Sequence, residues 1–283
     1  LSKKKINVRA DVRTGDTTPY QRQKMLKKPP HILITTPESL AIMLTSPKFK
    51  LLLHNVEWCI IDEVHALAEN KRGVHLSLSL ERLNRISPAM TRIGLSATIS
   101  PLKDIAGYLV GNENGKPRPC KILDVQFIKN MKLKVLSPVP DLVDQDHKQM
   151  HNSLYKLLDK IIQENKTTLI FTNTRAATER VVHHLKEKFP KNYIENIGAH
   201  HGSLSKTHRH SIENRLRKGE LKVIVSSTSL ELGIDIGSID MVLCLGSPKS
   251  VARFLQRAGR SGHQVNETVK AKIIVLDRDD LIE

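Results

Sequence analysis

The sequence predicts an α/β fold that is built on parallel sheets and divided into two units. Short runs rich in Val, Ile and Leu recur along the 283 residues, and most are followed by an amphipathic stretch. Such alternation is typical of βαβ units. It stops at residues 111–119 (GNENGKPRP) and restarts after residue 146. Because the length also corresponds to about two domains, we expect domains at residues 1–125 and 126–283.

The first unit is predicted to alternate strands and helices from residue 31 onward. Expected strands cover residues 31–35 (HILIT), 56–62 (VEWCIID) and 91–95 (TRIGL), with helices at residues 37–45, 74–86 and 101–109. Pro37 suits the first position of a helix. We interpret residues 111–119 as a linker, and we expect a strand pair at residues 121–127 and 133–136.

The second unit shows the same alternation. Its expected strands are residues 168–171 (TLIF), 195–197, 222–225 (KVIV), 241–245 and 272–276, and its clearest helices are residues 154–164 and 176–188. A chain of this length can bury full hydrophobic cores without disulfide bonds.

The composition excludes several classes of protein. The three cysteines, Cys59, Cys120 and Cys244, form no CxxC pair, which excludes a disulfide framework and favours a reducing, cytoplasmic setting. No apolar run reaches the roughly 18 residues of a membrane span, and the basic start has no apolar core of a signal peptide behind it. Lys and Arg outnumber Asp and Glu by 45 to 29, a net charge of +16. A polyanion such as nucleic acid is therefore the expected partner.

Two carboxylates follow the expected strand at residues 56–62. Asp62 and Glu63, in IIDEVH, stand at its carboxyl end, where ligands bind in open parallel sheets. An aspartate there can hold Mg²⁺ through water, and a neighbouring glutamate can activate an attacking water. The alternative is that one of them caps the following helix, and the hexapeptide alone does not decide between the two interpretations.

Polar residues also follow other expected strands. The segments are TTPES (35–39), GLSAT (94–98), FTNTR (171–175) and SSTSLELGID (226–235). Each of them can contact a ligand or serve as a turn and helix cap, and for TTPES the cap is favoured. QRAGRSGH (256–263) is more specific, because Arg257 and Arg260 would share one face of a helix and guanidinium groups suit a transferring phosphoryl group. A solvated basic face is the weaker alternative.

Taken together, TTPES, DEVH, SAT, FTNTR, SLELGID and QRAGRSGH resemble, in this order, the motifs of superfamily 2 ATP-dependent helicases. GLSATISPLKDIAGYLVG, SSTSLELGIDIGSIDMV and QRAGRSGH are most similar to the Lhr (large helicase-related) family. The resemblance implies two RecA-like parallel-sheet domains in tandem that sandwich Mg–ATP. It also implies translocation on single-stranded or duplex DNA, or on an RNA–DNA hybrid, with 3′-to-5′ movement in repair or recombination. A Ski2-like RNA helicase or a restriction-enzyme motor subunit is the alternative within the superfamily.

The same resemblance assigns roles to individual residues. It implies that Glu63 activates the hydrolytic water, that Asp62 holds Mg²⁺ through water, and that Arg260 is an arginine finger. The other implied positions are Gln256 and Arg257 as support for the finger at the nucleotide, Gly233 and Asp235 as nucleotide contacts, Ser96 and Thr98 as coupling residues, and Thr14, Gly15, Thr36, Pro37, Asn173, Arg175 and Thr228 as nucleic-acid contacts.

One family feature does not occur in the sequence. No GxxxxGK[ST] phosphate loop is found, and the nearest imitation, GNENGKP at residues 111–117, is one residue short between its glycines and ends in Pro. In the family this loop lies upstream of RADVRTGDT. The resemblance therefore implies a first domain truncated at its N-terminus, with the ATP-binding segment before this stretch and a winged helix and further domains after it. The alternative is a non-catalytic nucleic-acid-binding fragment.

Four histidines lie close together in the second unit, at positions 200, 201, 208 and 210. Such a cluster is compatible with a metal site, but no carboxylate or cysteine completes a known ligand spacing. We therefore do not expect a metal ion there.

Overall fold

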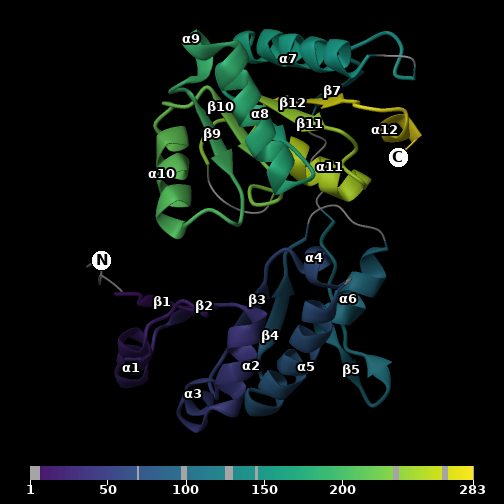
Figure 1. Cartoon of the computed structure of the whole chain (residues 1–283). Helices are drawn as coiled ribbons and strands as arrows, with labels where there is room; N and C mark the ends of the chain where they lie inside the picture. Colours follow the sequence, from purple (N-terminus) through teal and green to yellow (C-terminus); the bar gives the residue numbers. More distant parts are fainter. Residues whose placement is uncertain are drawn as a thin grey trace, which may run out of the picture. The chain divides into compact units, whose positions relative to one another are not determined.

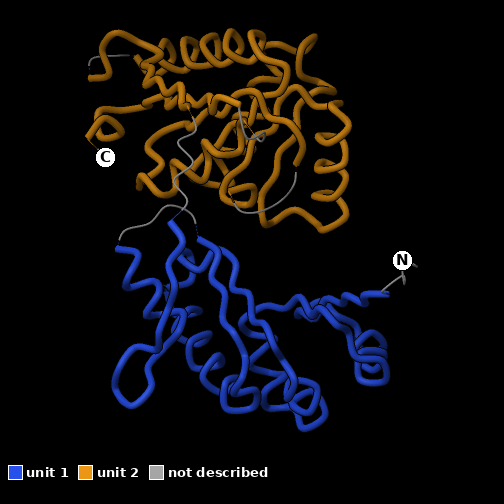
Figure 2. Tube along the Cα trace, turned by 180° about the vertical axis from the view of Figure 1, so that it is seen from behind, with its two compact units in different colours: residues 1–125 blue, residues 126–283 orange. Residues whose placement is uncertain are grey.

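The structure, a computed structural model, describes residues 7–68, 70–96, 101–124, 130–143, 146–231, 236–262 and 267–282. The chain divides into two compact units, residues 1–125 and 126–283, which Figure 2 colours separately. The sequence-predicted α/β class with parallel sheets is confirmed in both units. No helix of the described ranges is both long and apolar enough to cross a membrane.

Unit 1 contains two pairs of parallel strands. β1 (Ala10–Arg13) pairs with β2 (Ile32–Thr35), and β3 (Trp58–Ile61) pairs with β4 (Thr91–Gly94). The helices are α1 (Pro19–Lys27), α2 (Pro37–Thr45), α3 (Pro47–Leu52), α4 (Val64–Ala68), α5 (Lys71–Ile86) and α6 (Leu102–Val110), as labelled in part in Figure 1. Leu76, Leu80 and Leu83 recur on one face of α5 at the spacing of a helix and join Met43 and Ile61 in the core of the unit.

The stretch interpreted as a linker belongs to unit 1 and has structure of its own. β5 (Asn112–Glu113) and β6 (Lys116–Pro117) form an antiparallel hairpin. The two residues between them, Asn114 and Gly115, have positive φ angles of 51° and 77°, as a two-residue hairpin turn requires. Arg118, the residue after β6, anchors the hairpin through a bidentate contact with Glu81, at 2.7 and 2.9 Å.

Unit 2 is built on a six-stranded parallel sheet in the order β7-β12-β11-β8-β10-β9. The strands are β7 (Met131–Leu136), β8 (Thr168–Phe171), β9 (Ile197–His200), β10 (Val223–Ser226), β11 (Met241–Leu245) and β12 (Val269–Ile274). The helices are α7 (His147–Gln163), α8 (Arg175–Lys188), α9 (Pro190–Tyr193), α10 (Lys206–Arg217), α11 (Val251–Ala258) and α12 (Asp279–Ile282). Alternate strand residues face two cores, one formed with α7 and α8 and the other with α10 and α11.

The prediction that residues 121–127 and 133–136 form a strand pair is wrong. Residues 121–124 form no strand, Leu123 is 75% exposed, and residues 125–127 lie outside the described part of the chain. β7 instead pairs in parallel with β12, from Met131 opposite Val269 to Leu136 opposite Ile274. A distant apolar strand that continues the buried sheet provided a better partner than the exposed neighbouring segment.

Candidate functional site

The carboxylates Asp62 and Glu63 follow β3 in a constrained turn. The backbone N–H of Glu63 donates to Oδ1 of Asp62 at 2.9 Å. Glu63 itself has a φ of 51°, a left-handed conformation that is uncommon for a residue other than glycine and that concentrates at functional sites. The turn is fixed to the neighbouring strand, because Val64 N–H donates to the carbonyl of Leu95 at 3.0 Å. Asp62 is exposed and Glu63 half-buried, so both carboxylates are accessible to a ligand.

His65 connects Glu63 with Ser96 on the neighbouring strand end. Its Nε2 lies 3.3 Å from Oε2 of Glu63, and its Nδ1 lies 3.1 Å from Oγ of Ser96. The imidazole is buried at 6% exposure. A neutral imidazole satisfies both contacts when Nε2–H donates to the carboxylate and Nδ1 accepts from the hydroxyl. The structure thus brings DEVH and the serine of SAT together, while Thr98 lies outside the described residues.

The implied nucleic-acid contacts of unit 1 lie at one edge of the β1–β2 pair. Thr14 and Gly15 follow β1, and Thr36 and Pro37 follow β2, whose last residue Thr35 pairs with the last residue of β1. Thr36 caps α2, accepting from Ser39 N–H at 3.4 Å, so the favoured cap interpretation of TTPES is confirmed. A helix N-terminus with free N–H groups also suits a phosphate.

The implied nucleic-acid contacts of unit 2 follow adjacent strands as well. Asn173 and Arg175 follow β8, and Thr228 follows β10, which pairs with β8. All three side chains belong to exposed residues. Asn173 Nδ2 donates to the carbonyl of Ser247 at 2.9 Å, and Arg175 donates to Oγ of Ser203. Their proximity follows from the parallel sheet, since carboxyl ends of neighbouring strands share one edge.

The residues of QRAGRSGH differ sharply in exposure. Arg257, on α11, is fully buried, whereas Gln256 and Arg260 are half-buried. Glu231 accepts from Arg257 Nε at 2.8 Å, and the carbonyl of Glu231 accepts from Arg260 Nη2 at 2.9 Å. Arg257 is thus held within unit 2, in line with a supporting role. Gly233 and Asp235, the implied nucleotide contacts, lie outside the described residues.

Three of the four clustered histidines lie beside carboxylates. His200 Nε2 lies 3.2 Å from Oε1 of Glu213, and His210 Nδ1 lies 3.1 Å from its Oε2. His201 Nε2 lies 2.7 Å from Oε1 of Glu179. Burial lowers the pKa of His200, against the opposing effect of Glu213. The contacts of His200 and His201 join α10 and α8 to the end of β9.

A group of potential metal ligands lies elsewhere in unit 2, on α8. The ligand atoms of His183, His184 and Glu187 lie within 4.8 Å of one another. His183 and Glu187 are exposed and His184 is half-buried. His184 Nδ1 lies 3.0 Å from Oε2 of Glu187 on the same helix, and none of the three residues belongs to the motifs.

Comparison with known proteins identifies the family. Residues 1–105 match the DEAD/DEAH box helicase family, and residues 152–264 match the helicase conserved C-terminal domain. The chain is 56% identical over 279 residues to the ATP-dependent helicase Lhr-Core of Methanothermobacter thermautotrophicus, and 60% identical over 277 residues to ATP-dependent helicase Lhr-Core protein 2 of Thermococcus barophilus. This chain is a superfamily 2 DEAD/DEAH helicase core of the Lhr-Core type. In each of the two relatives the alignment covers 98% of the chain and 32% of the relative.

A solved structure supports the same assignment for the fold of this Lhr-type core. The structure of the Mycobacterium smegmatis helicase Lhr bound to ssDNA and AMP-PNP matches it with a TM-score of 0.88 and 40% identity, over 98% of this chain and 36% of that chain. The tandem helicase domains expected from the motifs are therefore confirmed. The chain spans about a third of the length of the curated relatives it matches.

Two residues of the Lhr-type core make contacts with motif residues that were not predicted from the sequence. His65 stands within the quoted DEVH and Glu231 within SLELGID, but neither had an assigned role. An acidic residue within an apolar run, as in Leu230-Glu231-Leu232, signals a buried charge that needs a partner. The partner, Arg257, is 26 residues away and could not be named from the sequence.

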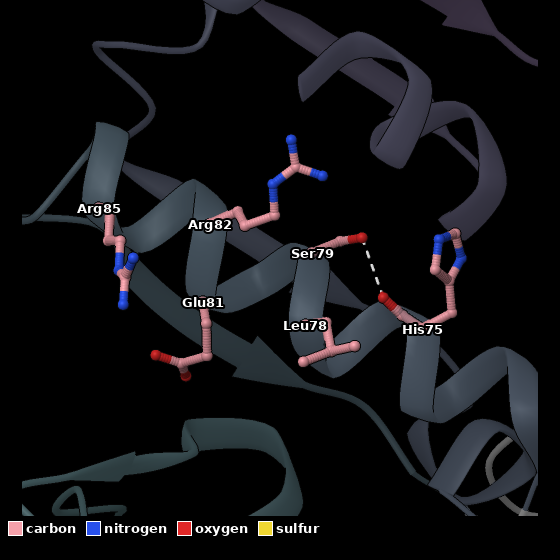
Figure 3. A pocket seen from close by; sticks show the side chains of 6 residues that line it. All are labelled: His75, Leu78, Ser79, Glu81, Arg82 and Arg85. Atoms are coloured by element: carbon pink, nitrogen blue, oxygen red, sulfur yellow. Dashed lines mark hydrogen bonds between the residues drawn. The ribbon is translucent and has the colours of Figure 1, made fainter. Parts of the chain in front are cut away.

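An open pocket on α5 was also not foreseen. Figure 3 shows the six residues that line it, and Ser79 Oγ donates to the carbonyl of His75 at 2.9 Å. The lining residues are His75, Leu78, Ser79, Glu81, Arg82 and Arg85. None of them belongs to the helicase motifs, and we assign the pocket no role.

Proposed function

We propose that the chain is the motor core of an ATP-dependent DNA helicase or translocase of Lhr type, moving 3′-to-5′ on DNA in repair or recombination. The observation that supports it most is the Asp62–Glu63–His65–Ser96 arrangement, in which adjacent strand ends of unit 1 bring a carboxylate pair and a hydroxyl into one hydrogen-bonded group. Identity of 56% and 60% to Lhr-Core helicases adds to this support.

In this proposal the residues of unit 1 act on ATP. Glu63 orients and deprotonates the attacking water, a role that its partly exposed carboxylate and its contact with His65 suit. Asp62 holds Mg²⁺ through water, since an exposed carboxylate oxygen is the kind of ligand that this ion prefers. Mg²⁺ held there would neutralise charge on the phosphate oxygens. Ser96 and Thr98 couple the nucleotide state to DNA binding.

Unit 2 supplies the arginine finger and further contacts to the nucleotide. Arg260 stabilises the charge of the transferring phosphoryl group, with support from Gln256 and Arg257, and Gly233 and Asp235 contact the nucleotide. The tracking DNA strand is held at Thr14, Gly15, Thr36 and Pro37 of unit 1 and at Asn173, Arg175 and Thr228 of unit 2. The Mycobacterium smegmatis relative, solved with ssDNA and AMP-PNP, supports both classes of ligand.

Unwinding by the full-length protein tests this proposal. Duplexes that carry a 3′ or a 5′ single-stranded tail are incubated with Mg–ATP, and strand release is followed by fluorescence. The proposal predicts ATP-dependent release from the 3′-tailed duplex. Release from only the 5′-tailed duplex would contradict the proposed direction, and ATP-independent release would contradict a motor.

A second candidate function applies to the 283 residues as they stand. Because no GxxxxGK[ST] segment occurs in them and this loop supplies the main contacts to the β- and γ-phosphates, the chain alone would bind nucleic acid without turning over ATP. Isothermal titration of the chain with Mg–ATP distinguishes the two candidates. Micromolar binding contradicts the second candidate, whereas DNA binding that weakens steeply with salt is expected in either case.

A further inference from the structure

Glu231 is a buried carboxylate that contacts two arginines and has no role in the proposed function. It follows β10 by five residues and is 8% exposed. One carboxylate oxygen, Oε1, lies 2.8 Å from Nε and 2.7 Å from Nη2 of Arg257. The other, Oε2, lies 3.7 Å from Nε of Arg253 on the preceding turn of α11. A single buried carboxylate thus fixes α11 through two arginines.

Arg257 is held on its other sides as well. Its side chain is fully buried, its guanidinium lies 5.2 Å from the centre of the Phe171 ring, and its Nη1 lies 3.4 Å from Oδ1 of Asn173. A buried guanidinium whose carboxylate partner is removed becomes an uncompensated charge. The position of Arg257, and with it the end of α11, therefore depends on Glu231.

Glu231 also holds Arg260, through the backbone carbonyl of Glu231. The carbonyl of Glu231 accepts from Arg260 Nη2 at 2.9 Å, and Arg260 N–H donates to the carbonyl of Arg257 at 3.1 Å. Glu231 N–H in turn donates to the carbonyl of Thr228 at 3.1 Å. The side chain of Glu231 therefore positions the segment from which Arg260 extends, and its carbonyl positions the Arg260 guanidinium.

We propose that Glu231 is the positioning residue of the arginine finger: its carboxylate fixes Arg257 and its carbonyl holds the guanidinium of Arg260. This inference rests on the proposed function of Arg260. It adds a specific dependence, because it makes the effect of Glu231 on turnover pass through Arg260. Fixing a finger in advance matters, since a misplacement of about 1 Å can cost about 100-fold in rate.

The test is a double-mutant cycle on DNA-stimulated ATP hydrolysis by the full-length protein. Glu231→Gln, Arg260→Ala and the double variant are compared, with Glu187→Gln on α8, an exposed glutamate, as the matched control. Arg260→Ala is expected to lower kcat by about 1,000-fold or more, the usual effect of a lost finger. Glu231→Gln is expected to lower kcat by roughly 10- to 100-fold, with the KM for ATP changed by less than about threefold. The control keeps the wild-type kcat.

The decisive outcome is the double variant. If Glu231 acts through Arg260, the double variant hydrolyses ATP within about twofold of Arg260→Ala alone, because the two losses do not add. A further loss equal to that of Glu231→Gln would overturn the inference and leave the role of Arg260 intact. A wild-type rate in Arg260→Ala would instead overturn the finger assignment and this inference together.

Loss of folding is separated from loss of positioning by two further measurements. Affinity for single-stranded DNA reports whether the Glu231→Gln variant is folded, and it is expected to match the wild type. If this variant does not fold, the cycle is repeated with Glu231→Asp, which keeps the charge and shortens the side chain by one methylene group. A merely structural role would change the fraction of protein that binds DNA and leave kcat per binding-competent molecule at the wild-type value, which would contradict the proposal.

Discussion

Replacement of His65 by Ala tests the hydrogen-bonded group at the end of β3. The substitution removes the contacts of 3.3 Å to Glu63 and 3.1 Å to Ser96, so that the glutamate loses its orienting partner and its connection to the neighbouring strand. Hydrogen bonds to charged groups contribute about 1.5–3 kcal/mol, equivalent to roughly 10- to 100-fold in rate. Because the Glu63 side chain is 36% exposed, solvent screening favours the lower end. We expect kcat to fall about 10-fold.

The assay is ATP hydrolysis by the full-length protein, with and without single-stranded DNA. His65→Ala is expected to reduce the DNA-stimulated rate more than the basal rate, because the link to Ser96 is lost together with the contact to Glu63. His75→Ala, an exposed histidine on α5, serves as the control and should match the wild type. Unchanged DNA stimulation in a folded His65→Ala variant would refute the coupling through His65.

Two further predictions concern the chain itself. Leu80→Ala, at a fully buried position of α5, should lower the free energy of unfolding by about 2–5 kcal/mol. Leu78 is 61% exposed on the same helix, so Leu78→Ala should change the free energy of unfolding by less than about 0.5 kcal/mol. Urea denaturation followed by circular dichroism measures both, and equal losses would contradict the packing. The hydrogen bond from Arg72 lowers the pKa of Glu38 from 4.5 to about 2, so the stability that this pair contributes is complete above pH 4.5 and is lost as pH falls toward 2. Arg72→Ala should raise the pKa of Glu38 toward its ordinary range in a carboxyl-detected NMR titration, because Arg72 is the largest cause of the lowered pKa; an unmoved pKa would contradict the contact.

Buried strands were the part of the fold best predicted from the sequence. β8 and β11 have the predicted bounds, at residues 168–171 and 241–245, because short apolar runs between polar segments are typical of parallel strands covered on both faces. β1 was missed, since Ala10-Asp11-Val12-Arg13 carries two charges in four residues. The partner of β7 was also missed, because β12 is separated from it by more than 130 residues and pairing at that distance leaves no local signal.

The candidate site was predicted unevenly for a similar reason. The placement of Asp62 and Glu63 at a strand end follows from local pattern and from a general rule for parallel sheets. The contacts of His65 with Ser96 and of Glu231 with Arg257 join residues 31 and 26 positions apart, and only the folded sheet brings them together. The motifs indicated which segments matter, but the geometry that joins them required the structure.

Turnover by a Glu63→Gln variant is the most direct test of whether Glu63 activates the water in ATP hydrolysis. The substitution keeps the size of the side chain and its capacity to hydrogen-bond, but it removes the base. In the full-length protein, DNA-stimulated ATP hydrolysis is compared with the binding of a fluorescent ATP analogue in the presence of Mg²⁺. We expect hydrolysis to be abolished while the affinity for the analogue stays near that of the wild type. Hydrolysis at the wild-type rate would contradict the assignment of Glu63.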